Sequence, residues 1–328
     1  MQKQQRLVIK KDGAAYFNAA AWYEVGTQHR ILILRKVSQA TGNGEPDWGE
    51  LVLVELDRSG SVLHEITVWS PDGSGKHLED PRALVLPDGR VMIGLTAVVK
   101  EDGVFVPFPA VLVLPSTKRF DKLPEVSVLT ELGAGKNTTP IDSHSLLFRR
   151  EGDENNHRLH VVEWDGEKAV DVGIIDFPKD LPWASWRIGT TTPPFWISEH
   201  EALLIIHGIR KQGGLYIYSL GRAKLVREGD SLKVSVFPQP LLTPDDFMVA
   251  DGQPLVEELN PSLRRVVYAT GGLLEEIDGK DNLNLFVNVG DRQTIEMLWP
   301  LEELKKGLWE GERGEITKNP EVYLGVGE

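Results

Sequence analysis

Short runs of apolar residues, separated by turn signals, recur along the whole chain. The runs alternate apolar and polar positions or are rich in Val, Ile and Leu, as β-strands are. Turns such as Pro87-Asp88-Gly89 join neighbouring runs and predict hairpins. The predicted strands are residues 30–36, 50–56, 61–69, 82–86, 91–99, 110–114, 144–148, 159–164, 170–176, 202–207, 214–219, 233–237, 265–269 and 283–289.

The pattern predicts an all-β fold with very little helix. Residues 300–308 (PLEELKKGL) place Glu four positions before Lys, which predicts a short C-terminal helix. Many short strands at regular spacing are typical of a sandwich, a barrel or a propeller. A unit of two apolar strands and a turn recurs about every 50 to 65 residues, which corresponds to about five propeller blades. No linker or shift in composition divides the chain, so residues 1–328 are predicted to form one domain.

Composition and charge exclude several classes of function. The chain has 328 residues and no cysteine, which excludes disulfides, thiolate metal sites and a thiol nucleophile. A formal net charge of −13 repels phosphate backbones, so nucleic acid is not an expected partner. The first 13 residues lack the apolar core of a signal peptide, and no apolar stretch is long enough to span a membrane. A soluble, cytoplasmic protein without a membrane partner is therefore expected.

The sequence also lacks the common motifs of metal, nucleotide and serine chemistry. The eight histidines have no clustered ligand spacing. GAGK at residues 133–136 lacks the second half of the Walker pattern, and no GxSxG nucleophile elbow occurs. No metal or organic cofactor is therefore expected. The nine tryptophans suit stacking on sugar rings, but core packing explains them equally well.

Three groups of polar residues stand at or near the predicted strands, and two of them lie in the N-terminal part of the chain. In LEDPR, Glu79 and Asp80 precede a proline, which favours the mouth of a strand over its centre. A carboxylate beside Arg82 fits either a structural ion pair or an acid in a cleft. Asn18 lies in YFNAAAW, and Arg35 ends an apolar strand. Arg35 either reaches solvent or presents its guanidinium to a sugar or a carboxylate.

The third group begins in WRIGTTTPP and continues through the two strands after it. It contains Arg187, His207, Arg210 and Tyr218, all predicted at strand ends or in loops, with His207 at the exit of its strand. A lone histidine there is more often a hydrogen-bonded core residue than a ligand. Several cationic and phenolic groups around one stretch nevertheless indicate a candidate site for an anion or a polyol.

These segments, in this order, resemble glycoside hydrolase family 130, five-bladed propellers that include β-mannoside phosphorylases and β-mannosidases. The resemblance covers nearly the whole chain and implies a five-bladed propeller, in agreement with the strand pattern. The matching segments are FNAAA (17–21), the strand that ends in Arg35, EDPR (79–82), WRIGTTTPP (186–194), IIHGI (205–209), YSLGRAKL (218–225), PLLTPDDF (240–247) and FVNVGD (286–291).

Carried over residue by residue, the resemblance implies that Asp80 is the catalytic acid. The mannosyl pocket would be lined by Asn18, Arg35, Arg82 and Asp291. Phosphate would be held by Lys136, by Arg187 in place of the family's usual Lys, and by His207 and Tyr218. In the implied inverting reaction, phosphate attacks the anomeric carbon while Asp80, its pKa raised by burial, protonates the leaving oxygen. Inorganic phosphate is then a co-substrate, and no cofactor is needed.

Two departures from the family pattern leave the reaction open. The family's phosphorylases place a phosphate-binding Arg where this sequence has Glu163 or Trp164, and their IGAG is IGTT here. Glu163 suits an inverting β-mannosidase instead, in which a carboxylate roughly 6.5–9.5 Å from the acid activates water. A non-catalytic glycan-binding propeller is the third alternative, since propellers host many functions.

The expected function is phosphorolysis of β-mannosides to α-mannose 1-phosphate. An oligosaccharide and phosphate are then the ligands of the site. Edge strands and residues 301–328 are candidate surfaces for a homo-oligomer.

Overall fold

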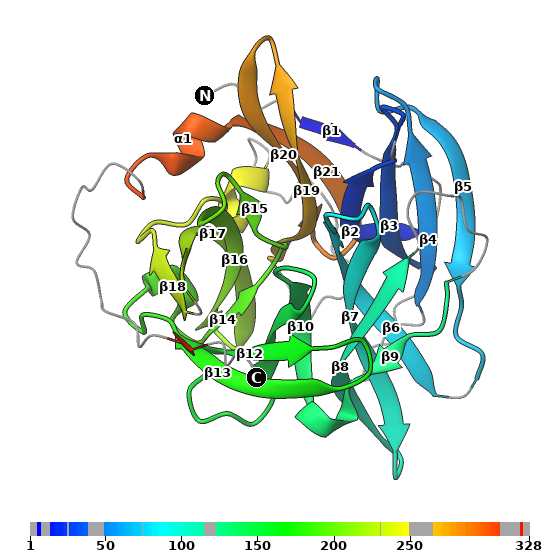
Figure 1. Cartoon of the computed structure of the whole chain (residues 1–328), viewed down its shortest axis with the longest axis vertical. Coiled ribbons are helices and arrows are strands. Elements are labelled where there is room, and N and C mark those ends of the chain that lie inside the picture. The colour runs from blue at the N-terminus through cyan, green and yellow to red at the C-terminus, as the bar shows by residue number, and fades with distance from the viewer. Residues whose placement is uncertain are drawn as a thin grey trace.

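The chain forms antiparallel strands that are arranged in blades around a central axis (Figure 1). The computed structural model describes residues 5–7, 14–24, 26–38, 49–73, 75–114, 123–229, 231–248, 265–308 and 322–323. Each predicted strand overlaps an observed one. Together with the arrangement of the strands in blades, this confirms the expected five-bladed propeller. The candidate self-association segment, residues 301–328, lies mostly outside the described residues.

The described strands fall into five blades. The first contains β2 (Ala15–Tyr23), β3 (Arg30–Val37), β4 (Gly49–Leu56) and β5 (Val62–Trp69). The second contains β6 (Lys76–Val85), β7 (Val91–Glu101), β8 (Val104–Leu114) and β9 (Ser127–Val128). The third contains β10 (Gly135–Pro140), β11 (Ser145–Arg150), β12 (Arg158–Trp164) and β13 (Ala169–Asp176).

Strands from the two ends of the described chain complete the last two blades. The fourth contains β14 (Arg187–Thr190), β15 (Phe195–Trp196), β16 (Glu201–Gln212), β17 (Leu215–Glu228), β18 (Ser231–Val236) and β22 (Val322–Tyr323). The fifth contains β19 (Val267–Ile277), β20 (Lys280–Val289), β21 (Gln293–Pro300) and β1 (Gln5–Leu7). A parallel pair between Tyr16 and Gln293 joins the fifth blade to the first.

Short helical segments connect the blades. They are η1 (Thr130–Leu132), η2 (Pro182–Ala184) and η3 (Pro244–Phe247), and the helix α1 (Leu301–Lys305) follows β21 of the fifth blade. The helix α1 is shorter than the predicted 300–308, because Lys306 is extended (ψ 132°) and Gly307 takes a φ of 76°. No helix in the described ranges is long and apolar enough to cross a membrane.

Apolar side chains fill the space between neighbouring blades. Leu147 on β11 packs in one cluster with Leu204 on β16, and Ile33 on β3 packs in another with Leu95 on β7. The other clusters join the remaining neighbouring blades in the same way. Because burial of apolar surface is the main favourable contribution to folding, these cores hold the blades as a rigid frame for the axis.

The innermost strands contact one another around the axis and share an irregularity. β2 contacts β6 and β19, β6 contacts β10, and β10 contacts β14. Shifts of register interrupt β2, β6 and β10 at Asn18, Asp80 and Asn137, whose φ values are 55°, 52° and 64°. Asn and Asp tolerate this left-handed conformation better than most other residues. Bulges re-aim side chains, and here they bring polar groups of different blades together.

Candidate active site

Asp80 lies inside β6, not at the mouth of a strand as predicted. The shift of register between Glu79 and Arg82 removes this segment from regular ladder pairing. Pro81 therefore costs no ladder hydrogen bond. The prediction was wrong because a bulge in the middle of a strand accepts a proline as readily as the strand's mouth does.

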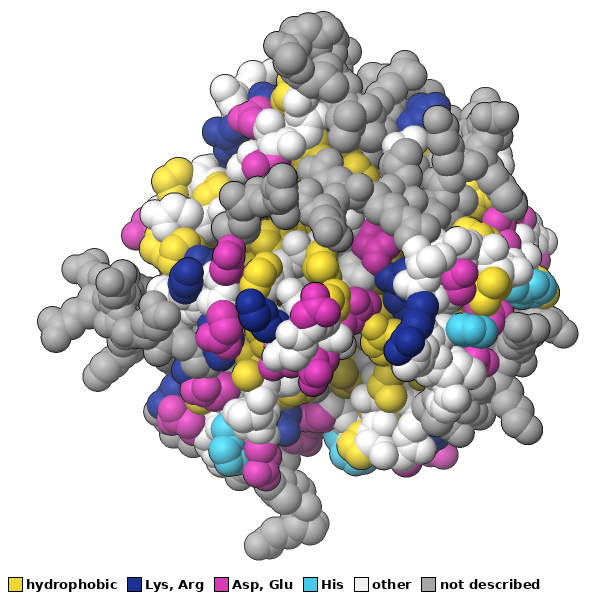
Figure 2. All heavy atoms as spheres, turned by 90° about the horizontal axis from the view of Figure 1, so that it is seen from above, with side chains coloured by type: hydrophobic (Ala, Val, Ile, Leu, Met, Phe, Trp, Pro, Cys, Tyr) yellow, Lys and Arg dark blue, Asp and Glu magenta, His cyan; other side chains and the backbone are white. Residues whose placement is uncertain are grey.

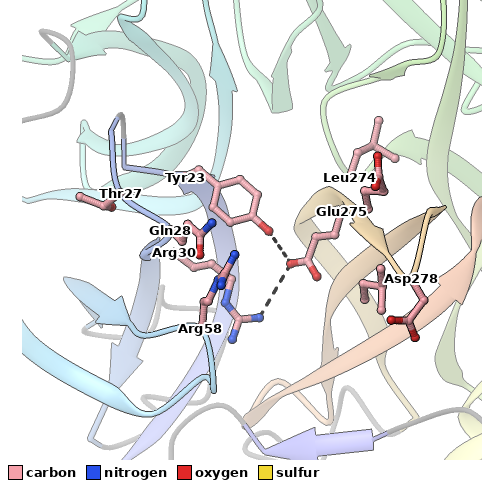
Figure 3. Close-up of a pocket in the computed structure, with 10 residues that line it drawn as sticks. Tyr23, Thr27, Gln28, Arg30, Arg58, Leu274, Glu275 and Asp278 are labelled. Atoms are coloured by element: carbon pink, nitrogen blue, oxygen red, sulfur yellow. Dashed lines mark hydrogen bonds and ion pairs between the residues drawn. The ribbon is translucent and has the colours of Figure 1, made fainter.

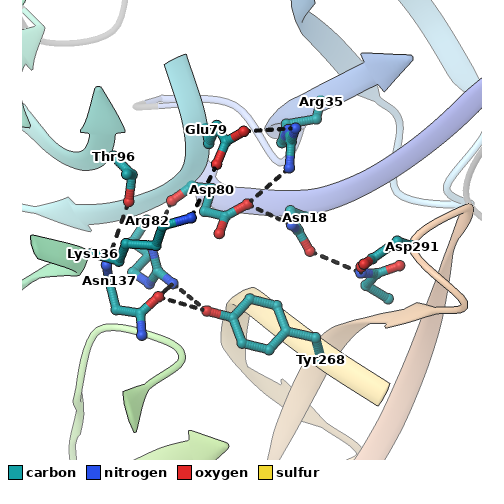
Figure 4. A network of polar contacts seen from close by, with 11 residues as sticks. Asn18, Arg35, Glu79, Asp80, Arg82, Thr96, Lys136, Asn137, Tyr268 and Asp291 are labelled. Atoms are coloured by element: carbon teal, nitrogen blue, oxygen red, sulfur yellow. Dashed lines mark hydrogen bonds and ion pairs between the residues drawn. The ribbon is translucent and has the colours of Figure 1, made fainter. Parts of the chain in front are cut away.

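Three predicted site residues converge on Asp80 (Figure 4). The Nδ2 amide of Asn18, on β2, donates to Oδ1 of Asp80 at 2.6 Å. Nη1 of Arg35, on β3, lies 3.3 Å from the same oxygen. Nη1 of Arg82 donates to the backbone carbonyl of Asp80 at 2.7 Å. The carboxylate is thus held by an amide and a guanidinium from the neighbouring blade.

The charges around Asp80 overturn one prediction about it. Burial raises the pKa of this carboxyl, but Arg35, Arg82, Lys136 and the hydrogen bond from Asn18 outweigh it. The pKa therefore lies below the ordinary value, whereas burial alone predicted a raised one. An anion that neutralised these cations would move the pKa of Asp80 upward.

Arg82 ties the innermost strands together from a fully buried position. Its Nε donates to the carbonyl of Thr191 at 2.9 Å, and its Nη2 donates to Oδ1 of Asn137 at 3.2 Å and to the Tyr268 hydroxyl. Tyr268 in turn donates to Asn137 at 3.2 Å. These contacts make Arg82 part of the frame that positions Asp80.

Asp291, which was predicted to line the sugar pocket, belongs to the same hydrogen-bond network. It lies between β20 and β21 with a φ of 48°. Nδ2 of Asn288 donates to Oδ1 of Asp291 at 2.6 Å and to Oδ1 of Asn18 at 3.0 Å. A chain of side-chain amides therefore links Asp291 to Asp80.

A second group, here called the cation cluster, consists of Lys136, Arg149 and Arg187. Lys136 and Arg149 stand opposite each other in the ladder of β10 and β11. Burial, together with the neighbouring charge of Arg149, lowers the pKa of Arg187, which begins β14. Nζ of Lys136 is 3.9 Å from Oε2 of Glu79, whose Oε1 accepts from Arg35 at 3.3 Å. The cluster is thereby connected to the surroundings of Asp80.

The cation cluster contrasts with the surface shown in Figure 2, where basic and acidic side chains are interspersed. The chain as a whole carries a net charge of −13. The three cations beside the axis are therefore a local concentration of positive charge in a protein whose net charge is negative. Such a local reversal of charge is what an anionic ligand requires in an acidic protein.

Arg149 was missed at the sequence level. Its side chain is only 7% exposed. Nε of Arg149 and Nε of Arg187 are buried, and neither has a hydrogen-bond partner among the described residues. Neighbouring buried cations are costly unless an anion compensates them. The signal in the sequence was the pair of arginines that ends β11, because strand alternation sends Arg149 and Arg150 to opposite faces.

His207 and Tyr218 lie within strands, which corrects their predicted place at strand ends. His207 is the seventh residue of β16, and Tyr218 is the fourth of β17; Arg210 also lies inside β16. The prediction for His207 was wrong because Gly208 does not end the strand, which continues through it to Gln212.

The imidazole of His207 is packed between aromatic rings and is uncharged. The rings of Tyr218 and Tyr268 have centroids 6.2 Å and 4.8 Å away. Burial, Arg149 and Arg82 hold the pKa of His207 well below its ordinary value. Nδ1 of His207 is 3.2 Å from Oγ1 of Thr191. His207 can therefore serve this site as a neutral hydrogen-bonding group.

Close packing around His207 requires a glycine on β14. A Cβ added to Gly189 would lie 2.4 Å from Cε1 of His207 and 2.6 Å from Nδ2 of Asn137.

Tyr218 is also enclosed, and burial raises its pKa to about 12. Its phenol therefore stays protonated at neutral pH and can donate a hydrogen bond.

Glu163 is the predicted residue that the structure does not bring to this site. It pairs with Ser145 on β11, four residues from Arg149 on the same strand. Four residues of strand span about 13 Å. Glu163 therefore lies toward the other end of its blade.

One group of metal-type ligands occurs among the described residues, and it lies away from Asp80. Ligand atoms of Glu24, His29 and Glu55 are within 4.8 Å of one another. Nδ1 of His29 is 2.7 Å from Oε1 of Glu55, so a hydrogen bond between these two side chains accounts for their contact.

A cavity of about 780 Å³ opens at the C-terminal end of β2, close to Tyr23, between the first and fifth blades (Figure 3). Tyr23 and Arg30 line one side of it, and Glu275 lines the other. Tyr23 is five residues from Asn18 along β2, a span of about 16 Å. The cavity is thus separate from the constellation around Asp80.

The architecture is shared with solved carbohydrate-active enzymes. A β-1,2-mannobiose phosphorylase from Listeria innocua, in complex with β-1,2-mannobiose, matches with a TM-score of 0.67 and 15% identity, over 94% of this chain and 99% of that chain. This chain has the five-bladed fold of the GH130 proteins. No protein-family model matches the sequence, and no curated protein matches it either.

Two further structures extend the comparison. One comes from work on the GH130 family of mannoside phosphorylases, which contains glycoside hydrolases that target β-1,2 mannosidic linkages in Candida mannan. It matches with a TM-score of 0.61 and 13% identity, over 88% of this chain and 85% of that chain. A glycosyl hydrolase from Bacteroides ovatus matches with a TM-score of 0.60 and 13% identity, over 88% and 84% of the two chains. The shared property is the fold.

Proposed function

We propose that this protein is an inverting β-mannoside phosphorylase. The observation that carries the proposal is the cation cluster beside Asp80, and above all the buried guanidinium of Arg149 next to that of Arg187. Guanidinium groups bind phosphate through charge-assisted hydrogen bonds. Arg149 supplies a phosphate-binding arginine from β11, in place of the one that the family's phosphorylases have where this sequence has Glu163 or Trp164. The mannoside class rests on the fold shared with the Listeria innocua enzyme and its bound β-1,2-mannobiose.

In the proposed reaction, an oxygen of phosphate attacks the anomeric carbon of the mannosyl unit. The bond between that carbon and the glycosidic oxygen breaks, and Asp80 gives its proton to the departing oxygen. The products are α-mannose 1-phosphate and the shortened sugar. Lys136, Arg149 and Arg187 compensate the charge of the nucleophile, while neutral His207 and Tyr218 supply hydrogen bonds.

Bound phosphate would also favour the protonated form of Asp80, because its negative charge raises the pKa of that carboxyl. In the free protein, Arg35, Arg82 and Lys136 hold the pKa of Asp80 low. A bound phosphate places negative charge near Lys136 and so opposes that effect. Because the attacking group is itself an anion, the reaction needs no second protein carboxylate as a base.

Hydrolysis is the competing reaction, and it would need such a base within roughly 6.5–9.5 Å of the acid. The register of β11 and β12 argues against Glu163 in that role. Phosphorolysis conserves the energy of the glycosidic bond in a sugar phosphate, which is useful inside a cell. We therefore also propose a cytoplasmic location.

Dependence on phosphate tests the proposal. β-1,2-Mannobiose is incubated with the protein at several phosphate concentrations, including none, and mannose 1-phosphate and free mannose are quantified separately. The proposal predicts mannose 1-phosphate at a rate that rises with phosphate and vanishes without it. Free mannose at an unchanged rate would establish hydrolysis instead. Binding of the sugar without any product would favour a glycan-binding propeller.

A further inference from the structure

A carboxylate stands inside the cation cluster. Glu151 directly follows β11, and its Oε1 accepts a hydrogen bond from Nη2 of Arg149 at 2.7 Å. Its Oε2 is 3.8 Å from Nη2 of Arg187. One side chain thus uses an oxygen on each of the two guanidinium groups that the proposed function assigns to phosphate.

Glu151 is held in place and is ionised. Its backbone amide donates to the carbonyl of Ala134 at 2.9 Å, which extends the ladder of β10 and β11 by one residue. Burial raises the pKa of Glu151, but Arg149, Arg187 and Lys136 outweigh it, so the pKa is lowered. The side chain is still 29% exposed, which leaves it room to turn toward solvent.

Glu151 and phosphate compete for the same donors. Both are anions, both present oxygens at the spacing that a guanidinium recognises, and the Nη2 atoms of Arg149 and Arg187 are already engaged by Glu151. Without phosphate, the carboxylate compensates two neighbouring cations that would otherwise repel each other. With phosphate, it adds a like charge a few ångströms from the ligand, which weakens binding.

We propose that Glu151 is the residue that sets the phosphate affinity of this site, as the internal counter-ion of Arg149 and Arg187. It releases both guanidinium groups when phosphate binds. This inference rests on the proposed phosphorylase function and adds to it a residue that determines affinity for the nucleophile. Glu151 itself makes no bond to the reacting atoms.

The test compares Glu151→Gln with Glu154→Gln. Glutamine keeps a hydrogen-bonding oxygen for Arg149 and removes the charge. Glu154 is an exposed carboxylate of the same connection between β11 and β12, so its variant removes the same charge from the same segment. In phosphorolysis of β-1,2-mannobiose, Glu151→Gln is expected to lower the KM for phosphate about tenfold and to leave the KM for the sugar and kcat within about twofold. Glu154→Gln is expected to match the wild type.

A second measurement makes the inference independent of turnover. Titration calorimetry with inorganic phosphate should give the same gain in affinity for Glu151→Gln, and thermal melting confirms that each variant is folded. Equal phosphate affinity in wild type and Glu151→Gln would overturn the inference, as would an equal gain in Glu154→Gln. Loss of turnover in Glu151→Gln would also overturn it, because Glu151 would then act on the reacting atoms. If the wild type forms no mannose 1-phosphate, the proposed function fails, and the calorimetric comparison still decides the role of Glu151.

Discussion

Nδ2 of Asn18 lies 2.6 Å from Oδ1 of Asp80, although 62 positions separate the two residues and they stand on neighbouring blades. Both occupy bulges, and both have a positive φ. The position of the carboxylate is therefore set by two irregular strands that meet at the axis. Hydrogen bonds from Asn288 link Asn18 to Asp291, so the first, second and fifth blades share one polar network.

Replacement of Asp80 by Asn is expected to lower kcat about 10²–10⁴-fold, because the proton donor to the leaving oxygen is lost. Asn tolerates the left-handed φ of 52° at this position, so the bulge should persist. Binding of β-1,2-mannobiose, measured by calorimetry, should stay within a few-fold of the wild type. Turnover that survives in Asp80→Asn would show that another residue is the acid.

The role of Arg149 is tested by a matched pair of substitutions on β11. Arg149→Lys replaces a buried guanidinium by an ammonium group that cannot bind an anion in the same forked way. We expect the KM for phosphate to rise about 10- to 100-fold, with a smaller effect on the KM for the sugar.

Arg150→Lys is the control for that substitution. Arg150 lies on the other face of the strand, where its Nη2 donates to Oδ2 of Asp171 at 2.9 Å. Its variant should leave the KM for phosphate unchanged. The same rise in both variants would mean that Arg149 acts through the stability of the blade and not through phosphate.

Phosphate should shift the pH dependence of the reaction. Asp80 must be protonated to act, and Arg35, Arg82 and Lys136 lower its pKa, while Glu79 faces Arg35 and Lys136. Activity should therefore fall as pH rises, and bound phosphate should move this fall to higher pH. Rates measured from about pH 5 to about pH 9 at low and high phosphate test the shift. The ionisation of phosphate itself does not depend on its concentration, so an alkaline limb that never moves would contradict the coupling.

His160 should make the stability of the third blade depend on pH. Burial lowers its pKa, but Asp171 at 2.7 Å and Asp153 at 2.8 Å outweigh it and raise the pKa above 6.5. Its contribution is therefore fully present below the unfolded pKa and is lost as pH rises through the raised folded pKa. We expect His160→Gln to lower the free energy of unfolding by about 1–3 kcal/mol near pH 5.5, and by less near pH 9.

Urea unfolding of wild type and variant at both pH values provides the measurement. His144→Gln, at an exposed histidine of the same blade, should have little effect at either pH. An equal loss for His160→Gln at both pH values would mean that packing of the ring, not its charge, is responsible.

The outer strands could be predicted from the sequence, but several innermost strands could not. Strands such as β3 and β16 bury apolar residues against the neighbouring blades, so their pattern is clear. In contrast, β2, β10 and β14 carry polar residues toward the axis, among them Asn18, Asn137 and Thr190, and alternation is lost. The strands that hold the site are thus the ones that a hydrophobic pattern detects least well.

Site residues that lie in distinctive short segments could be predicted from the sequence. Residues whose place depends on how strands pair in the sheet could not. Asp80 and Asn18 lie in distinctive segments, and the structure brings both together. Arg149 lies in an ordinary run that ends β11, where alternation separates it from Arg150 but does not say which of the two faces the site; its ladder pairing with Lys136 does. The same register separates Glu163 from the site. The pKa of Asp80 also depended on cations from other strands, which burial alone could not indicate.

The most direct test of the account is to follow the reaction of β-1,2-mannobiose with phosphate by phosphorus and proton nuclear magnetic resonance. The account predicts that α-mannose 1-phosphate appears as the first product, one for each mannose released, while inorganic phosphate decreases equally. Two mannose molecules for each disaccharide, with inorganic phosphate unchanged, would contradict phosphorolysis, and a first product with the β configuration would contradict inversion.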